Sequence, residues 1–173
     1  TNGEVLFNTG KFDHVKWLGA WNPQYVKIER TETWDYLGAF IEIGHELGLR
    51  VHAGFNTMVV GSQNTLGSQG ILYRDSTKKS WATVTNSSSG YKSCLEAKSN
   101  TTMFMNPVLP EVQDYICSLL ADLATYKELD GIILDRGRFD GIDSDFSDYT
   151  KSEFEKFVGH SVNFAKDVLP AGY

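Results

Sequence analysis

A carboxylate followed at once by two arginines is the feature of this sequence with the clearest chemical potential. Asp135 closes the apolar run 131–134, and Arg136, Arg138 and Asp140 come directly after it. A short apolar run that ends in charged residues is typical of a buried strand that delivers a carboxylate to the rim of a sheet. A nearby guanidinium favours the ionised form of a carboxyl group, and that form is the nucleophile. Asp135 is therefore the leading catalytic candidate, with a structural ion pair to Arg136 or Arg138 as the alternative.

A second short run places polar residues where its strand would end. Residues 49–56 follow a glycine and precede a polar stretch, which is typical of a strand. Because side chains alternate along a strand, His52 and Asn56 share one face. The other run likewise sets Ile133 and Asp135 on one face. Parallel strands end at the same edge of a sheet, so we expect Asn56 and Asp135 at one rim. This small and polar face suits the interior of a barrel.

Helical patterns alternate with these runs. The predicted helices are 34–47, with Thr33 as N-cap and Gly48 at its end, a helix that begins at Pro110, and one with Thr150 as N-cap and Gly159 at its end. Each of the first two leads into a strand. This alternation predicts an α/β fold with a parallel sheet and right-handed crossovers.

A long polar insertion separates the two strands. Residues 57–106 are rich in Ser, Thr, Asn and Gly, with strand-like pieces at Ile71–Tyr73 and Trp81–Val84. An excursion of this length on the catalytic side of a sheet shapes a binding site in many enzymes. The alternative is a solvated surface insertion.

The composition is that of an acidic globular protein. Its 173 residues are 41% hydrophobic and 22% charged, enough for one domain with a substantial core. The net charge is -6 and the pI is about 5.2, which argues against nucleic acid as a partner, since phosphate binding needs clustered Lys and Arg. No apolar run approaches the roughly 20 residues that span a bilayer, so no membrane span is expected. Cys94 and Cys117 either pair or stay free.

Aromatic residues make up 13% of the chain. Trp21 and Trp81 offer rigid faces suited to stacking on sugar rings, with core packing as the alternative. The acidic stretch 140–148 lacks the central Gly and terminal Glu of a calcium loop and is predicted to be a solvated surface. No metal and no other cofactor is expected.

The sequence resembles the glycosyl hydrolase-like family 10 through three motifs that occur in the same order: His45 to Asn56, Asn106-Pro107, and Asp130 to Asp135. Members of that family are similar to alpha-amylase-type (β/α)8 barrels. The resemblance covers most of residues 34–159. It implies a bacterial carbohydrate-active enzyme that is secreted, periplasmic or on the cell surface, with a poly- or oligosaccharide substrate. It also implies that Asp135 occupies the nucleophile position of amylase-like enzymes. The candidate substrate contacts are His52, Asn56, Arg136, Arg138, Asp140, Trp21 and Trp81.

Two requirements of such an enzyme are not met within the sequence. A complete (β/α)8 barrel takes about 250 residues, whereas only the two strands above and an early one at Val5–Phe7 are indicated. We therefore expect residues 1–173 to form a single incomplete TIM-type barrel domain with a long insertion at about 57–106. The remainder would come from further chain or a partner chain.

Retaining glycosidases also need a second carboxyl group about 5 Å from the nucleophile. Asp140 is the candidate for this second carboxyl group.

The sequence leaves two functions open. One is a glycoside hydrolase; the other is a non-catalytic carbohydrate-binding or structural cell-envelope domain with a vestigial cleft.

Overall fold

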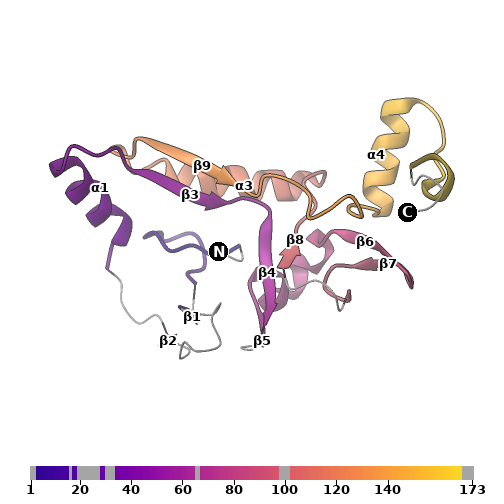
Figure 1. Cartoon of the computed structure of the whole chain (residues 1–173), viewed down its shortest axis with the longest axis horizontal. Coiled ribbons are helices and arrows are strands. Elements are labelled where there is room, and N and C mark those ends of the chain that lie inside the picture. The colour runs from indigo at the N-terminus through magenta and orange to yellow at the C-terminus, as the bar shows by residue number, and fades with distance from the viewer. Residues whose placement is uncertain are drawn as a thin grey trace.

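The computed structural model describes residues 3–15, 34–64, 67–97 and 102–168, together with the backbone of two short strands at residues 17–18 and 28–29. Figure 1 shows the arrangement of its elements. In chain order they are β1 (Trp17–Leu18), β2 (Ile28–Glu29), α1 (Tyr36–Glu46), β3 (His52–Asn56), β4 (Val59–Asn64), β5 (Gly67–Gln69), α2 (Ile71–Arg74), the 3-10 helix η1 (Ser76–Trp81), β6 (Val84–Ser87), β7 (Gly90–Ser93), β8 (Thr102–Phe104), α3 (Pro110–Leu123), β9 (Gly131–Asp135), α4 (Asp148–Val158) and the π-helix η2 (Phe164–Val168).

The two predicted strands pair in parallel, as expected. β3 and β9 align residue for residue from His52 with Gly131 to Asn56 with Asp135. α1 leads into β3 and α3 leads into β9, and Figure 1 shows α3 running along the strand pair. Parallel pairing with helical connections is compatible with the predicted α/β class. Within the described residues the parallel sheet has these two strands and does not close into a barrel.

The core lies between the strand pair, α3 and the insertion. Phe55 of β3 is 8% exposed and belongs to one cluster with the buried side chains Val60, Leu72, Met103, Met105, Val112, Leu119 and Leu123. Ala53 and Ile132 pack against the same cluster. Burial of an aliphatic or aromatic side chain of this size contributes about 2 kcal/mol. The face of β3 that carries Ala53 and Phe55 therefore packs against the core. The opposite face, which carries His52, Gly54 and Asn56, does not belong to this cluster.

The helix ends follow the predicted signals in part. α3 begins at Pro110, and Gly159 ends α4 in the left-handed conformation with φ +78°. The N-cap of α1 is Asp35, whose carboxylate accepts from the Gly38 amide at 3.1 Å. Thr33 lies outside the described residues and is not the cap.

The predicted N-cap of α4 at Thr150 is also wrong. The cap is Ser147, whose hydroxyl accepts from the Thr150 amide at 3.2 Å. The Thr150 hydroxyl instead donates to Asp145 at 2.6 Å. The helix thus begins nearly one turn earlier than predicted, because the side chain that suggested a cap has a partner elsewhere.

The insertion is folded rather than a loose surface loop. β5, β4 and β8 form an antiparallel sheet, and β6 and β7 form a hairpin. The strand predicted at Ile71–Tyr73 is wrong, since Ile71 and Leu72 lie buried in α2. Short apolar runs do not distinguish a strand from a buried helical turn. The strand predicted from Trp81 begins only at Val84, after η1 ends.

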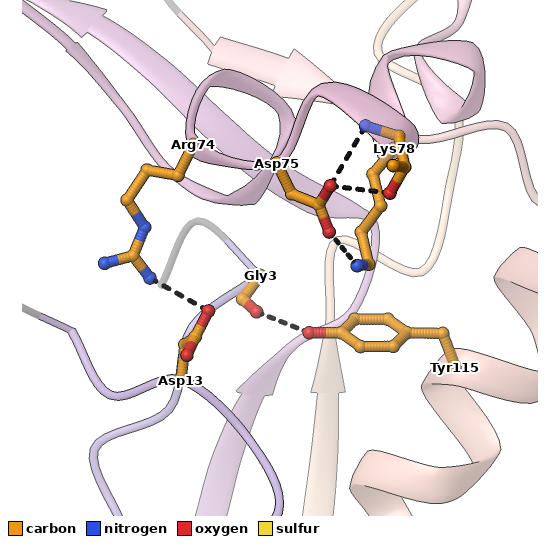
Figure 2. A network of polar contacts seen from close by, with 7 residues as sticks. Gly3, Asp13, Arg74, Asp75, Lys78 and Tyr115 are labelled. Atoms are coloured by element: carbon orange, nitrogen blue, oxygen red, sulfur yellow. Dashed lines mark hydrogen bonds and ion pairs between the residues drawn. The ribbon is translucent and has the colours of Figure 1, made fainter.

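The strand predicted at Val5–Phe7 is likewise wrong, because Val5 forms only an isolated bridge with His14. Side-chain contacts instead fix this N-terminal segment, and Figure 2 shows two of them, Arg74 with Asp13 and Tyr115 with Gly3. Arg74 lies 2.7 Å from Glu4 and 3.5 Å from Asp13, and the Tyr115 hydroxyl donates to the Gly3 carbonyl at 2.8 Å. Burial raises the pKa of Tyr115 to about 12. These contacts fasten residues 3–13 to α2 and α3.

A histidine and an aspartate connect α1 to the beginning of β9. The His45 ring lies 2.8 Å from an Asp130 carboxylate oxygen, which also accepts from the Val51 amide at 2.7 Å. The hydrogen bond from His45, followed by the one from Val51, lowers the pKa of Asp130 below its ordinary value. Because the folded protein holds the proton less tightly than the unfolded chain, this stability is complete above the ordinary pKa of 3.8 and is lost as the pH falls through the folded pKa.

Asp130→Asn should therefore flatten the acid limb of the stability curve. The amide keeps an oxygen for the Val51 amide hydrogen and removes only the titrating charge. We expect the difference in free energy of unfolding between wild type and variant to shrink as the pH is lowered from about 5 to about 3. Urea unfolding at each pH measures it, and parallel curves for the two proteins would contradict the assignment.

α1 and β3 meet at a glycine. A Cβ atom at Gly44 would stand 2.4 Å from Cγ2 of Val51. Gly44→Ala should destabilise the protein by about 1 to 3 kcal/mol through overpacking, although alanine is favoured in helices by about 1 kcal/mol. Combining it with Val51→Ala should cost less than the sum of the two single changes, as measured by a double-mutant cycle in urea. Additive costs would show that the two residues do not contact.

Candidate active site

Asn56 and Asp135 end neighbouring strands at one rim. They are register partners, so their side chains leave the sheet on the same face, about 5 Å apart along the strand-pairing direction. The Thr57 amide donates to the Asp135 carbonyl at 2.8 Å, which fixes the two strand ends together. Asp135 is exposed. The predicted rim is confirmed, and a carboxylate and an amide stand side by side on it.

His52 lies lower on the same face, above a glycine of the partner strand. A Cβ atom at Gly131 would stand 2.6 Å from Cδ2 and 3.0 Å from Nε2 of His52. The ring therefore fills the space that any other residue at position 131 would occupy. Gly54, between His52 and Asn56, has no atom within 4 Å of its own missing Cβ. This leaves an open strip along the face that leads to the rim.

The amide oxygen of Asn56 is shielded and lacks a hydrogen-bond partner within the described part of the chain. A buried acceptor without a donor costs about 1 to 3 kcal/mol. A ligand hydroxyl or a water can supply the donor. Of the predicted sugar contacts, Asn56 is thus the one with an open hydrogen-bonding requirement.

The two arginines lie on the turn that follows β9. Arg136, directly after Asp135, adopts φ +51°, an uncommon conformation for a non-glycine residue. Arg138 donates through Nη1 to the carbonyls of Phe139 at 2.9 Å and Asp140 at 2.8 Å. Among the described residues, no ion pair joins Asp135 to either arginine. Their predicted role in holding Asp135 ionised stays a prediction without a contact to carry it.

Asp140 is half-buried in the same turn. Burial raises the pKa of Asp140, the neighbouring Asp143 raises it further, and Arg138 and Arg136 oppose the shift. A raised pKa keeps a carboxyl group protonated to higher pH, as a proton donor requires.

Asp145 is the polar residue of this region that sequence analysis missed. It is 9% exposed rather than part of a solvated acidic surface. Its carboxylate accepts from the Val84 amide at 2.5 Å, the Asn106 side chain at 2.7 Å, and the hydroxyls of Ser147 at 2.5 Å and Thr150 at 2.6 Å. This network fastens the end of the 136–146 turn to β6 and α4. The sequence offered one signal for this network, the Asn106-Pro107 motif. The side-chain amide of Asn106 had been given no hydrogen-bond partner in the sequence analysis.

Of the two predicted stacking residues, Trp81 lies within the described part of the chain. The Trp81 ring is half-buried, 5.1 Å from the Tyr115 ring and 5.4 Å from the Lys78 ammonium. Trp21 lies outside the described residues.

The two cysteines do not pair with each other. Cys94 is buried and Cys117 is exposed, and both are free thiols.

Neither a metal-ligand cluster nor a membrane-spanning helix is found in the described part of the chain. No three His, Cys, Asp or Glu side chains there gather as ligands for a metal ion. In the same residues, no helix combines the length and apolarity needed to cross a membrane.

Comparisons with known proteins identify the family of the chain. The family model described as glycosyl hydrolase-like 10 matches residues 2–167. The chain belongs to this family. It is also 35% identical over 128 residues to an S-layer-related protein of Niallia circulans. That match covers 72% of this chain and spans 8% of the relative's length. The chain therefore spans only a small part of the length of this relative.

Gly131→Ala tests the packing of His52. The new methyl group should displace the imidazole from its position above β9, at little cost in stability because the His52 ring is exposed and can turn away. We expect the His52 ring resonances to shift in proton NMR spectra while the urea midpoint changes little. Gly54→Ala on the same face meets open space and serves as the control, with little change in either. Unchanged His52 resonances in Gly131→Ala would contradict the contact.

Proposed function

We propose that this chain supplies the sugar-binding and nucleophile-bearing part of a glycoside hydrolase active site acting on a poly- or oligosaccharide. The observation that carries the proposal is the register of β3 and β9, which sets Asn56 beside Asp135 at the carboxyl end of parallel strands. Membership of the glycosyl hydrolase-like 10 family supports the reaction class. Asp135 is the nucleophile in this proposal.

The chemistry follows that of two-carboxylate glycosidases. The Asp135 carboxylate attacks the anomeric carbon while a protonated carboxyl group gives its proton to the leaving oxygen, and water then releases the sugar from Asp135. Asp140 is the proposed proton donor, supported by its half-buried setting and raised pKa. His52 and Asn56 contact sugar hydroxyls, and Arg136 and Arg138 line the turn above. Trp21 and Trp81 stay proposed stacking residues.

We propose further that residues 1–173 are part of a (β/α) barrel domain. Parallel sheets are covered on both faces in known folds. Here Ile133 and Leu134, on opposite faces of β9, are 57% and 54% exposed. Residues 51–55 line a groove of about 680 Å³ together with Phe40 and Ile43 of α1, and among the described residues β3 pairs with β9 alone. Further (β/α) units of the same protein or of a partner chain would cover these surfaces.

The relative's name supports a place at the cell surface or outside the cell, and it also favours a second function. In this second function the hydrolase-like chain would serve attachment rather than catalysis. The specific observation in favour of this reading is that no second carboxylate contacts Asp135 among the described residues. In that case the rim would bind carbohydrate or serve the cell envelope without cleaving it.

Hydrolysis of 2,4-dinitrophenyl glycosides of glucose, galactose, xylose and N-acetylglucosamine tests the nucleophile. Such leaving groups need little protonation, so the reaction isolates the attack by Asp135. We expect turnover by the wild type and a loss of at least about 10³-fold in Asp135→Asn. Asp114→Asn, an equal charge change on an exposed residue of α3, should leave the rate unchanged.

Two outcomes oppose the proposal. Equal rates in wild type and Asp135→Asn would remove Asp135 from the reaction, and no turnover by folded wild-type protein would favour the attachment function. Asp140→Asn separates the second role. It should slow hydrolysis of phenyl glycosides, which need a proton, far more than hydrolysis of dinitrophenyl glycosides.

A further inference from the structure

A second hollow lies apart from the Asp135 rim. It has a volume of about 490 Å³ and is formed by β7, α4 and the segment up to η2. Its lining comprises Tyr91, Lys151, Ser161, Val162, Asn163, Phe164, Ala165 and Asp167. In Figure 1 the β6–β7 hairpin and α4 occupy the same end of the molecule, beyond the ends of β3 and β9. None of the rim residues takes part in it.

An aromatic corner forms one side of this hollow. The Tyr91 ring stacks on Phe146 at 5.4 Å with an interplanar angle of 7°. Phe164 stands nearly perpendicular to both rings, at 5.9 Å and 78° from Tyr91 and at 5.0 Å and 79° from Phe146. Phe146 is 6% exposed, whereas Tyr91 is 47% exposed. The buried ring thus holds the exposed one in a fixed orientation, which lowers the entropic cost of stacking a ligand on it.

The polar side of the hollow is also held in place. The Val162 amide donates to Glu155 at 2.8 Å, and the Asn163 amide donates to Asp167 at 2.7 Å. The side-chain oxygen of Asn163 accepts from the Ala165 amide at 3.1 Å. The NH2 group of Asn163 has no partner among the described residues and is available as a donor. A rigid aromatic face beside a free amide donor is the combination that binds a sugar ring and its hydroxyls.

The charges of the hollow indicate the kind of sugar. It contains one cation, Lys151, and one anion, Asp167. Lys151 also lies 3.8 Å from Glu155. Because acidic groups offset the ammonium, the hollow offers no net attraction for an anionic polymer. A neutral saccharide fits it better.

We propose that the Tyr91–Phe164 corner is a second carbohydrate subsite, which binds a neutral polysaccharide at a distance from the Asp135 rim. Its ligand class rests on the proposed function, but its residues do not. A subsite of this kind holds a polymer on the protein by a second contact, and two contacts on one chain raise the apparent affinity. The same polymer would then be presented to the rim.

Affinity gel electrophoresis tests the subsite in the Asp135→Asn protein, so that binding is measured without cleavage. The probes are amylopectin, hydroxyethylcellulose, galactomannan and arabinoxylan as neutral polymers, and polygalacturonate as an acidic one. We expect at least one neutral polymer to retard the protein. Tyr91→Ala and Asn163→Asp should each raise the dissociation constant about tenfold. Asn163→Asp keeps the oxygen that accepts from the Ala165 amide, so it tests the donor without removing the local hydrogen bond.

Phe157→Ser is the matched control, because this α4 side chain is 87% exposed and does not line the hollow. Its retardation should equal that of the parent, and near-UV circular dichroism checks that each variant is folded. Retardation by none of the neutral polymers, retardation by polygalacturonate alone, or full retention of binding in both Tyr91→Ala and Asn163→Asp would each overturn the subsite. Hydrolysis by the wild type without retardation removes this proposal alone, whereas retardation without hydrolysis removes only the catalytic one.

Discussion

The parallel pairing of β3 with β9 is the constraint on which the rest of the structure depends. Two parallel strands cannot be joined by a tight turn, so the chain must return from the end of β3 to the beginning of β9. α3 makes that return, and the insertion between β3 and α3 lies at the carboxyl ends of the strands. The same pairing brings Asn56 beside Asp135. The pairing of β3 with β9 therefore determines both the route of the chain between the two strands and the residues that meet at the rim.

The Asp145 network gives the rim its second support. Residues after Asp135 leave the sheet in a turn that has few apolar contacts of its own, since Gly137 and Arg138 are exposed. Four hydrogen bonds to the buried Asp145 carboxylate anchor the far end of this turn. Hydrogen bonds to a buried carboxylate are among the stronger kind, and the loss of one partner leaves a charged group unsatisfied. The position of Asp140 within this turn thus depends on contacts made by a residue five positions later.

The sequence predicted correctly those features that depend on residues close together in the chain. Pro110 and Gly159 mark helix ends because proline and glycine restrict or release the backbone at those positions, and the structure confirms both. The alternation of side chains likewise predicted the rim. The strand predicted at Ile71 was wrong because burial against the core, rather than local propensity, selects the helical turn there. Asp145 was missed because its partner Asn106 lies 39 residues away, and only the fold brings them together.

The two faces of the strand pair show why chemistry belongs to one of them. On the core face, Ala53, Phe55 and Ile132 pack against α3 and the insertion. On the other face, Gly54 leaves open space and Gly131 makes room only for the His52 ring. A face built for packing would carry larger apolar side chains at these positions, because an unfilled core site costs stability. Glycines beside polar residues instead produce a strip with room for a ligand between its walls. A further element that covered Ile133 would form the opposite wall of this strip, and it would have to bring a carboxyl group close to Asp135 if Asp140 does not serve as the acid.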